Sequence, residues 1–474
     1  MIFIKFFTVF TICQFCLTSC ICQLLTISTT NYDYDGNRMA PIILVHGVTK
    51  SQIMGKYSSP GPLKCPVSNG WEHLWMNVDI AFSGTHYQKC WAYRLKLLYD
   101  RSRHKCTNQV GVQTRVEGSF GSLGASDFVT DNFAARLLPD FQYFHKFITA
   151  FEMRGYTKDF SLKLAPYDWR YAPPQIGETG YYTRLTRLIE QTATQTGRKV
   201  ALVAHSMGGL VLAYFLNQKP QAWKNQYIQV LITSGTPWLG SAEALNKYIE
   251  GEDYGAPTID KSVILTLSQS FQSLAYLLPQ EEAFAKTVLV EWVPKGRKYT
   301  AQNYQQFFQD AGFIDGYLMR QDLRHLYPVP LNRLGVKYVC TWANSSKIET
   351  PITYRIKSDK LTDTSDYEKV NTVGDAVVPL KSLRYCEKFP HAIVKGFQGH
   401  SHTGLIKSDE FFDYVSSVVS QAQPVGAQAQ PGGSQGRPGR AQGQPGGSQG
   451  QPGGSQVNLV DLKLSPVAFR PEAE

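Results

Sequence analysis

The fold of this chain is decided by the twelve-residue stretch KVALVAHSMGGL at 199–210. A run of apolar residues leads into Ser206, and a helix-compatible segment follows it. Small residues two positions before and two after the serine, Ala204 and Gly208, permit the tight strand-to-helix turn known as a nucleophile elbow, which keeps the serine hydroxyl exposed. The surrounding strand and helix favour a catalytic nucleophile at Ser206 over a serine that only caps a helix.

A nucleophilic serine needs a histidine that takes its proton and an acid that orients the histidine, and in this fold the acid precedes the histidine in the chain. Asp375 stands in the segment NTVGDAVVP at 371–379, where we expect the acid; a plain turn aspartate is the alternative. His400 and His402 share one small-residue loop further on. We expect His402 to be the base because it directly precedes a helical stretch. His205, beside the nucleophile, is expected to pack beneath the elbow.

Acyl transfer also needs two backbone N–H donors for the negatively charged oxygen of the tetrahedral intermediate. The N–H of Met207, directly after the nucleophile, is one candidate. The second is expected in the loop HGVTK at 46–50, which follows the apolar run PIILV at 41–45. Glycine in such a loop lets the backbone approach a substrate closely. A simple strand-to-helix turn is the alternative.

Apolar strand-like runs alternate along the chain with helical stretches such as 181–196. This alternation predicts a doubly wound parallel sheet, and together with the elbow it predicts an α/β-hydrolase fold. The strand-like runs lie at 41–45, 199–204, 228–233, 336–341 and 392–397. Two long segments, about 51–170 and 241–334, do not fit the minimal sheet, and we expect them to be insertions that form a cap.

The two ends of the chain differ in composition from its middle. Residues 1–22 carry one lysine and then an apolar run, which predicts a signal peptide and not a membrane anchor. Residues 419–457 are rich in Gln, Pro, Gly and Ser and repeat the motif QPGGSQ, so we expect a disordered tail that continues into a C-terminal tail at 458–474. The hydrolase domain is then expected to span 23–418.

A secretory leader implies an oxidising compartment, in which cysteines pair. Four of the five cysteines that remain after the leader are therefore expected to form disulfides; the five are Cys65, Cys90, Cys106, Cys340 and Cys386. Asn344 begins the glycosylation sequon NSS. The net charge of +10 is spread along the chain without a nucleic-acid recognition motif, which argues against a nucleic-acid partner. Basic surface suits anionic lipid headgroups, or it is only a solvated face.

Beyond the elbow, a series of motifs follows in a fixed order between residues 41 and 415. They include CW at 90–91, APYDWR at 165–170, AHSMG at 204–208, QAWK at 221–224 and FFQDAGF at 307–313. This ordered set resembles the lecithin:cholesterol acyltransferase family, and within it the branch of phospholipases A that also acylate ceramide. The resemblance implies Ser206, Asp375 and His402 as the catalytic triad, with oxyanion donors at Thr49 and Met207.

The resemblance further implies the disulfides Cys65–Cys90 and Cys340–Cys386, with Cys106 left unpaired. The first disulfide would close a small membrane-binding insertion. Trp71 and Trp75 lie within that loop, and tryptophan prefers the bilayer interface. The alternative for either tryptophan is a place in the core of the cap.

Three segments depart from the family's pattern. The loop that usually reads Pro-Gly-x-Leu-Gly is HGVTK here, which places Lys50 where the second glycine would be. The acidic motif reads GDAV at 374–377 and not Gly-Asp-Gly-Thr-Val, and GSFG at 118–121 carries an inserted serine. These departures concern substrate preference and pH optimum more than the class of reaction.

We therefore expect a serine-dependent phospholipid acyl hydrolase and O-acyltransferase that works at a phospholipid membrane surface. It would pass the acyl chain from Ser206 to water or to a lipid alcohol acceptor, without a metal, a cofactor or an obligate protein partner. The leader indicates a secreted or lysosomal enzyme. Two alternatives stay open: a sterol O-acyltransferase of the same family, and a catalytically weak lipid-binding protein.

Overall fold

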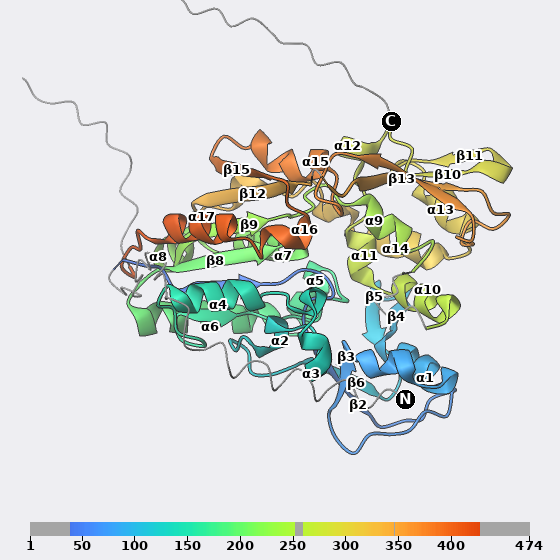
Figure 1. Ribbon diagram of the computed structural model, residues 1–474, viewed down its shortest axis with the longest axis horizontal. Coiled ribbons are helices and arrows are strands. Elements are labelled where there is room, and N and C mark those ends of the chain that lie inside the picture. The colour runs from blue at the N-terminus through green and yellow to red at the C-terminus, as the bar shows by residue number, and fades with distance from the viewer. Residues whose placement is uncertain (1–37, 252–258, 346, 427–474) are drawn as a thin grey trace, which may run out of the picture. The chain divides into compact units, whose positions relative to one another are not determined.

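The computed structural model describes residues 38–251, 259–345 and 347–426 (Figure 1). A six-stranded sheet in the order β15-β12-β9-β8-β1-β7 forms its centre, and all neighbouring strands run parallel. The strands are β1 (Ile42–Val45), β7 (Leu162–Leu164), β8 (Val200–His205), β9 (Ile228–Ser234), β12 (Tyr338–Asn344) and β15 (Ala392–Gln398). This sheet, with a helix directly after the serine turn, confirms the predicted α/β-hydrolase class.

Helices pack around the sheet in two groups. One group comprises α6 (Tyr181–Thr196), α7 (Met207–Asn217) and α8 (Gln221–Tyr227), which meet where Phe215 contacts Tyr182 and Trp223. In the other group, α4 (His145–Met153) meets α17 (Asp409–Val419) through Phe147 and Phe411. Every residue of β1 and β8 is buried, which explains why both strands are unbroken apolar runs and do not alternate. The helix predicted at 181–196 is confirmed at both ends.

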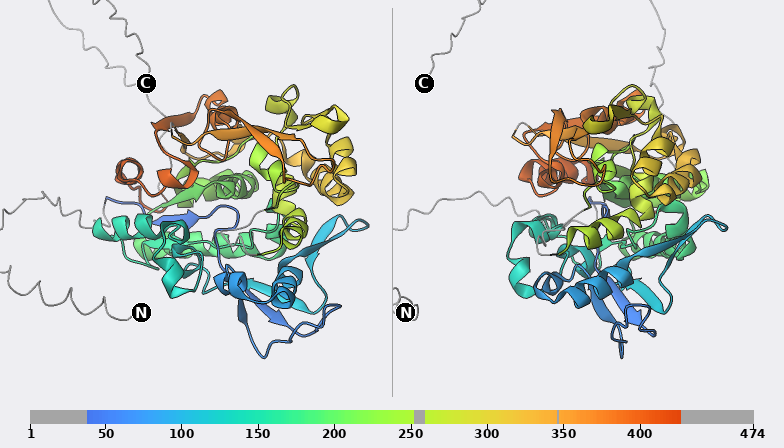
Figure 2. Two further views of the ribbon diagram at one scale, coloured as in Figure 1. Left: turned by 45° about the vertical axis from the view of Figure 1, so that its right-hand side comes forward. Right: turned by 90° about the vertical axis from the view of Figure 1, so that its right-hand side faces the viewer.

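The first insertion carries a three-stranded sheet of β2 (Ile53–Tyr57), β3 (Glu72–Trp75) and β6 (Val112–Val116). It also contains the helices η1 (Val78–Phe82), α1 (Thr85–Leu95), α2 (Gly124–Asp127) and α3 (Phe133–Arg136), and the hairpin of β4 (Leu97–Asp100) and β5 (Lys105–Asn108). The hydroxyl of Tyr99 on β4 donates a hydrogen bond of 2.6 Å to Asp322 of the second insertion. The two insertions therefore lie side by side (Figure 2).

The second insertion is mainly helical. It contains α9 (Ala242–Asn246), α10 (Lys261–Gln269), α11 (Gln272–Tyr276), α12 (Glu281–Phe284), α13 (Tyr304–Asp310) and α14 (Ile314–Leu323). Its strands β10 (Val290–Trp292) and β11 (Arg297–Tyr299) join β13 (Thr350–Ile356) and β14 (Tyr367–Thr372) in a second sheet. The acidic segment around Asp375 follows β14 directly, so this sheet positions it.

Two predicted boundaries are wrong. The insertion expected at 51–170 contains β7, which pairs with β1 at the edge of the central sheet. A three-residue strand is too short to produce a recognisable periodic pattern. At the other end, the domain continues past 418, because the Ala422 N–H donates to the Arg38 carbonyl at 2.8 Å and the Gly426 N–H donates to the Gln226 carbonyl at 3.3 Å. The predicted leader, residues 427–457 of the predicted tail and all of 458–474 lie outside the described residues.

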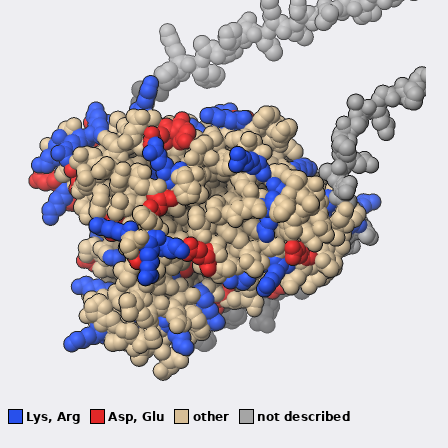
Figure 3. Space-filling model, turned by 180° about the vertical axis from the view of Figure 1, so that it is seen from behind, with Lys and Arg blue, Asp and Glu red and all other residues tan. Residues whose placement is uncertain are grey.

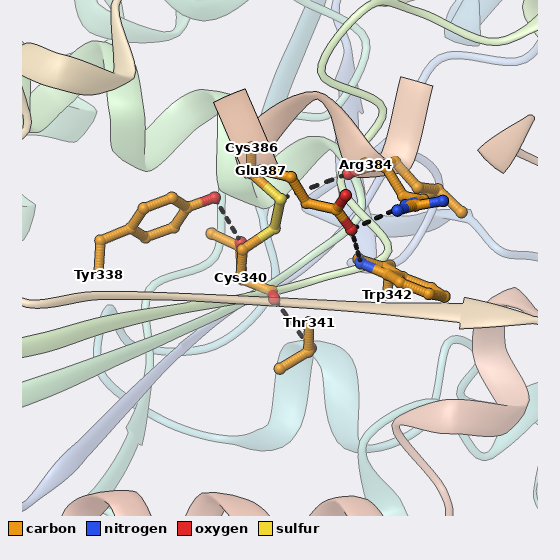
Figure 4. The surroundings of a disulfide bond; sticks show 9 residues. Tyr338, Cys340, Thr341, Trp342, Arg384, Cys386 and Glu387 are labelled. Atoms are coloured by element: carbon orange, nitrogen blue, oxygen red, sulfur yellow. Dashed lines mark hydrogen bonds and ion pairs between the residues drawn. A yellow bond between two sulfur atoms is a disulfide. The ribbon is translucent and has the colours of Figure 1, made fainter. Parts of the chain in front are cut away.

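Two disulfides tie the fold together. Cys65 bonds to Cys90 and thereby closes the loop that leads into α1, while Cys340 on β12 bonds to Cys386 in η6 (Arg384–Lys388). Figure 4 shows the second disulfide beside the indole of Trp342 and the side chain of Glu387. Both pairings implied by the resemblance are confirmed, and Cys106 is buried and unpaired as expected.

Charge is scattered over the surface. On the face drawn in Figure 3, Lys and Arg lie among Asp and Glu and do not form a continuous stripe. Some of these groups are paired, as where Lys298 approaches Glu291 at 3.3 Å. Within the described part of the chain, no helix combines the length and the apolar character that a membrane crossing requires.

Removing the Cys340–Cys386 disulfide should destabilise the domain. The bond joins residues 46 positions apart, and releasing a loop of that size in the unfolded chain lowers the free energy of unfolding by about 4 kcal/mol. The measurement is the denaturation midpoint of the doubly substituted Cys340→Ser, Cys386→Ser protein in urea, compared with the unsubstituted protein. An unchanged midpoint would show that the bond contributes nothing to stability.

Candidate active site

Ser206 occupies a strained turn between β8 and α7. Its backbone angles are φ 57° and ψ −129°, which residues other than glycine rarely adopt. The Ser206 N–H donates to the Ser234 carbonyl of β9 at 2.8 Å. A Cβ on Gly208 would lie 2.6 Å from the carbonyl oxygens of Val45 and His46, so only glycine fits where α7 crosses the end of β1. The elbow predicted from the sequence is present.

The structure brings the three predicted triad residues into one hydrogen-bonded line. His402 Nε2 lies 3.0 Å from Ser206 Oγ, and His402 Nδ1 lies 2.7 Å from Asp375 Oδ2. Asp375 is fully buried, and its other carboxylate oxygen accepts the N–H groups of Val377 at 3.1 Å and Val378 at 2.7 Å. This arrangement can draw a proton from the serine hydroxyl onto an imidazole held by a fixed carboxylate.

Only one of the two candidate histidines reaches the serine. His402 begins the short helix α16 (His402–Leu405), and its backbone N–H donates to the Asp375 carbonyl. His400 instead lies with Nε2 3.2 Å from Glu410 Oε2, at the surface and away from Ser206. The preference for His402 over His400 therefore agrees with the geometry.

A buried hydrogen-bond relay, which the sequence did not reveal, lies behind the triad. The Gly47 N–H donates to the hydroxyl of Tyr143 at 3.0 Å, and that hydroxyl lies 2.6 Å from His205 Nδ1. His205 Nε2 lies 2.9 Å from the His402 carbonyl. Burial lowers the pKa of His205 well below its usual value, so the ring is neutral: it accepts from Tyr143 and donates to His402. The relay links the loop after β1 to the backbone of His402.

The loop after β1 lies beside the nucleophile and is held by buried partners. A Cβ on Gly47 would come within 2.8 Å of Ser206 Cβ, and Thr49 has a positive φ of 64°. His46 stacks on Tyr167, whose N–H donates to His46 Nε2 at 3.1 Å. On the other side, the indole N–H of Trp75 donates to the Thr49 carbonyl at 2.9 Å.

Contact of Trp75 with the bilayer surface, as predicted, does not fit this structure, although the residue lines the second pocket described below. The side chain is completely buried and packs against Trp91 and Trp169. The physical reason is that the insertion needs a core of its own, and that the indole N–H is used to hold the loop beside the serine. Trp71 is partly exposed, with the guanidinium of Arg115 over its ring at 4.5 Å.

A cavity of about 910 Å³ opens above Ser206 and His402. Its wall carries charged side chains of both signs, namely Lys50, Asp140, Glu243, Lys247, Glu349 and Lys369. A second pocket of about 410 Å³, with mainly apolar walls that include Trp91 and Val78, borders it. The two spaces share the apolar side chains of Met76, Leu138 and Phe141, so the second pocket is a direct neighbour of the cavity above the serine.

Large apolar side chains are exposed on the two segments that line this second pocket, although only Phe82 and Leu138 among them line the pocket itself. Phe82 at the end of η1 is 87% exposed, and Phe133 at the start of α3 is 78% exposed. A hydrogen bond of 3.1 Å from Asn132 to Asp79 holds the two segments together. We call this surface the apolar rim; it consists of Phe82, Phe133, Leu137 and Leu138. Sequence reasoning missed it because the pattern of tryptophans pointed to the neighbouring loop.

The predicted glycosylation site lies at the end of β12. Asn344 is partly exposed, and its side-chain amide donates to Gln398 on β15 at 3.1 Å. A glycan on this nitrogen would replace one of its two hydrogens. Modification of Asn344 stays a prediction.

Substitution of Tyr143 should impair the site more than it impairs the fold. Tyr143→Phe leaves the Gly47 N–H and His205 Nδ1 without their buried partner, which lowers the free energy of unfolding by about 1–3 kcal/mol and loosens the loop and His402. We expect the turnover number on a soluble ester to fall at least tenfold. Tyr156→Phe is the matched control, because its buried hydroxyl donates to the Ala40 carbonyl away from the serine. Equal losses of turnover in both variants would contradict a role for the relay.

Acid should destabilise the domain in part through His46. Burial lowers the pKa of His46 from 6.5 to about 4, so between these values the unfolded chain binds a proton that the folded chain does not. This group's share of the stability is fully present above pH 6.5 and is lost as the pH falls through 4, a change of about 3 kcal/mol. His46→Gln should therefore show a smaller loss of unfolding free energy between pH 7 and pH 4 in urea titrations. Parallel pH profiles for the two proteins would refute this assignment.

Comparison of the sequence with known proteins finds a family of acyltransferases and phospholipases. The family model described as lecithin:cholesterol acyltransferase matches residues 71–329. The lysosomal phospholipase A and acyltransferase of Canis lupus familiaris is 31% identical, over 81% of this chain and 92% of that protein. The phosphatidylcholine-sterol acyltransferase of Mus musculus is 30% identical, over 67% of this chain and 70% of that protein.

Among solved structures, the Tle4-Tli4 complex contains a chain similar to this one at a TM-score of 0.45 and 12% identity, covering 80% of this chain and 98% of that one. The family model spans more than half of the present sequence, and the canine relative is matched over nearly its whole length. The chain therefore belongs to the lecithin:cholesterol acyltransferase family.

Proposed function

We propose that this protein is a serine-dependent phospholipid acyl hydrolase and O-acyltransferase. The observation that carries the proposal is the line from Ser206 through His402 to Asp375, which opens into a cavity large enough for a lipid. The names of the relatives, phospholipase A and acyltransferase in one case and phosphatidylcholine-sterol acyltransferase in the other, support the same class of reaction.

In the first half of the reaction, Ser206 Oγ attacks the ester carbonyl of a glycerophospholipid while His402 Nε2 takes the hydroxyl proton. Asp375 keeps Nδ1 of His402 protonated and stabilises the imidazolium that forms. His402 then gives the proton to the departing lysophospholipid oxygen, and the acyl chain stays on Ser206 as an ester.

The negative charge that develops on the carbonyl oxygen needs fixed donors. We propose the backbone N–H groups of Thr49 and Met207, which flank the serine from the loop after β1 and from the start of α7. Such donors stabilise the intermediate because they are held in place before the reaction begins. Trp75 and Tyr143 act as positioning residues for this loop, since they bond to the Thr49 carbonyl and the Gly47 N–H.

In the second half, an acceptor replaces the lysophospholipid. Water would yield a free fatty acid, and a lipid alcohol would yield a new ester. A covered site that limits water favours the alcohol. The apolar pocket that borders the cavity offers a place for the acyl chain, because its shared wall of Met76, Leu138 and Phe141 begins at the site.

We place the contact with the phospholipid surface at the apolar rim. Its exposed Phe and Leu side chains stand on the two segments that line the pocket that would take the acyl chain, so a lipid could leave the bilayer directly into the site. Trp71, directly before β3, would add an aromatic side chain to this contact. The disulfides fit an oxidising compartment, and we propose a secreted or lysosomal enzyme.

Products should depend on Ser206. The mature protein and Ser206→Ala are incubated with phospholipid vesicles that contain a short-chain ceramide and cholesterol, and lipids are measured by mass spectrometry. Free fatty acid with acylceramide supports the phospholipase and transacylase, whereas cholesteryl ester assigns the sterol branch. We expect at least a 10³-fold loss in Ser206→Ala. Lipid binding with no serine-dependent product would refute the enzyme and favour a lipid-binding protein.

Different substitutions should impair membrane binding and catalysis independently of each other. Phe82→Ser combined with Phe133→Ser removes two exposed anchors, each contributing about 1.5–3 kcal/mol when buried in lipid, so binding to vesicles in a flotation assay should weaken more than tenfold. Hydrolysis of a soluble ester should persist.

Trp75→Phe should lower hydrolysis of the soluble ester and leave vesicle binding unchanged, because the Thr49 carbonyl loses its donor while the apolar rim is intact.

Met153→Ser is the control for lost exposed apolar surface, since Met153 is 72% exposed at the end of α4 and outside the rim. If Met153→Ser weakens flotation as much as the rim variant does, the rim is not the docking surface.

A further inference from the structure

The turn that carries Asp375 contains a residue with a strained backbone. Ala376, directly after the acid, has a φ of 78°, which lies in the left-handed region that favours glycine. An alanine in this region is disfavoured on its own and persists only where its surroundings fix it. The contacts that fix Ala376 therefore bear on the placement of the acid.

The backbone around Ala376 is also the backbone that aims the carboxylate. We call residues 374–379 the acid turn. Within it, the Asp375 N–H donates to the Val378 carbonyl at 3.3 Å, and Asp375 Oδ1 accepts the N–H groups of Val377 and Val378. A change of φ at Ala376 would rotate both of these N–H groups away from the carboxylate, because they follow Ala376 directly in the chain.

One hydroxyl group holds Ala376 from the second sheet. Thr350, the first residue of β13, is completely buried, and its Oγ1 accepts the Ala376 N–H at 2.8 Å. The hydroxyl lies close against the acid turn, since a Cβ on Gly374 would come within 2.6 Å of Thr350 Oγ1. Thr350 pairs with Thr372, the last residue of β14, so the register of the two strands places the hydroxyl beside the turn.

A second hydroxyl group holds the acid turn from the second insertion. Ser241, directly before α9, is only 5% exposed, and its Oγ donates to the Val377 carbonyl at 2.5 Å. The same oxygen accepts the Glu243 N–H at 3.2 Å, so the start of α9 sets its direction. The two hydroxyls bracket the strained residue: one binds the N–H of Ala376 itself, and the other binds the carbonyl of the next residue.

The two hydroxyl groups differ in their access to a substrate. Ser241 lines the cavity above Ser206, whereas Thr350 is not among the described residues that form its wall. Thr350 is completely buried, so it can influence the reaction only through the residues that it holds. Substitution of Thr350 therefore changes the acid turn without removing a contact to the substrate.

We infer that Thr350 and Ser241 are positioning residues, whose hydroxyls hold Ala376 in the left-handed conformation and thereby keep Asp375 aimed at His402 Nδ1. The inference rests on the proposed acyl transfer and adds to it that the second sheet and the second insertion both align the acid. Glycine adopts the left-handed conformation without strain. A glycine at position 376 should therefore make the two hydroxyls dispensable.

The test is steady-state hydrolysis of a soluble ester by variants of the full chain. Thr350→Val removes the hydroxyl and nearly keeps the shape of the side chain. We expect its turnover number to fall by about tenfold or more with KM little changed, because the acid shifts while the cavity does not. Thr350→Ser retains a hydroxyl and should keep most of the turnover. Thr353→Val is the matched control, since its buried hydroxyl on the same strand donates to the Val288 carbonyl.

Rescue distinguishes positioning of the acid from support of the fold. Adding Ala376→Gly to Thr350→Val should restore most of the lost turnover. Ser241→Ala should lower the turnover number several-fold, and Ala376→Gly should rescue this variant too, so the test stands even where Thr350→Val does not fold. Full turnover in a folded Thr350→Val, or a loss that Ala376→Gly restores in neither variant, overturns the inference.

Ser206→Ala, measured in the same assay, separates this inference from the proposed function. Loss of turnover in Ser206→Ala with full turnover in Thr350→Val and Ser241→Ala overturns the positioning role alone. Turnover that persists in Ser206→Ala refutes the proposed reaction, and the positioning role with it.

Discussion

The close contact between Gly208 and the carbonyl groups that end β1 is the constraint on which the rest of the site depends. It brings the first turn of α7 against the loop at 46–50 with no space for a side chain between them. Ser206 is thereby forced into a backbone conformation that residues other than glycine rarely adopt, and its hydroxyl points toward His402. The strain is sustained because β1 and β8 are buried neighbours in the sheet, so the turn cannot relax without separating them.

Fixed hydrogen bonds then align the groups around the serine. Asp375 is held by two backbone N–H groups, and His402 is held by Asp375 on one side and by His205 on the other. Through Tyr143, the same relay reaches the loop that carries Thr49. A neutral His205 matters here, because a protonated ring could not accept the Tyr143 hydrogen. The oxyanion loop and the base are therefore positioned together.

The sequence was informative where the chemistry imposes a local pattern. The small residues around Ser206 were sufficient to predict the elbow, and the helical stretch that directly follows His402 was sufficient to choose the histidine that reaches the serine. The relay could not be predicted, because Tyr143 and His205 are 62 positions apart and no motif joins them. Trp75 was misjudged for a related reason: whether a tryptophan meets lipid or core depends on Trp91 and Trp169, which only the folded insertion places beside it.

The central claim is that an acyl group passes through Ser206, and trapping that intermediate tests it most directly. The protein is mixed with a small excess of phospholipid vesicles, quenched in acid within one turnover and digested with trypsin. The account predicts that the peptide spanning 200–224 carries the mass of the transferred acyl chain, and that fragmentation places it on Ser206. Product formation with no acyl group on this peptide, or with the acyl group on another residue, would contradict it.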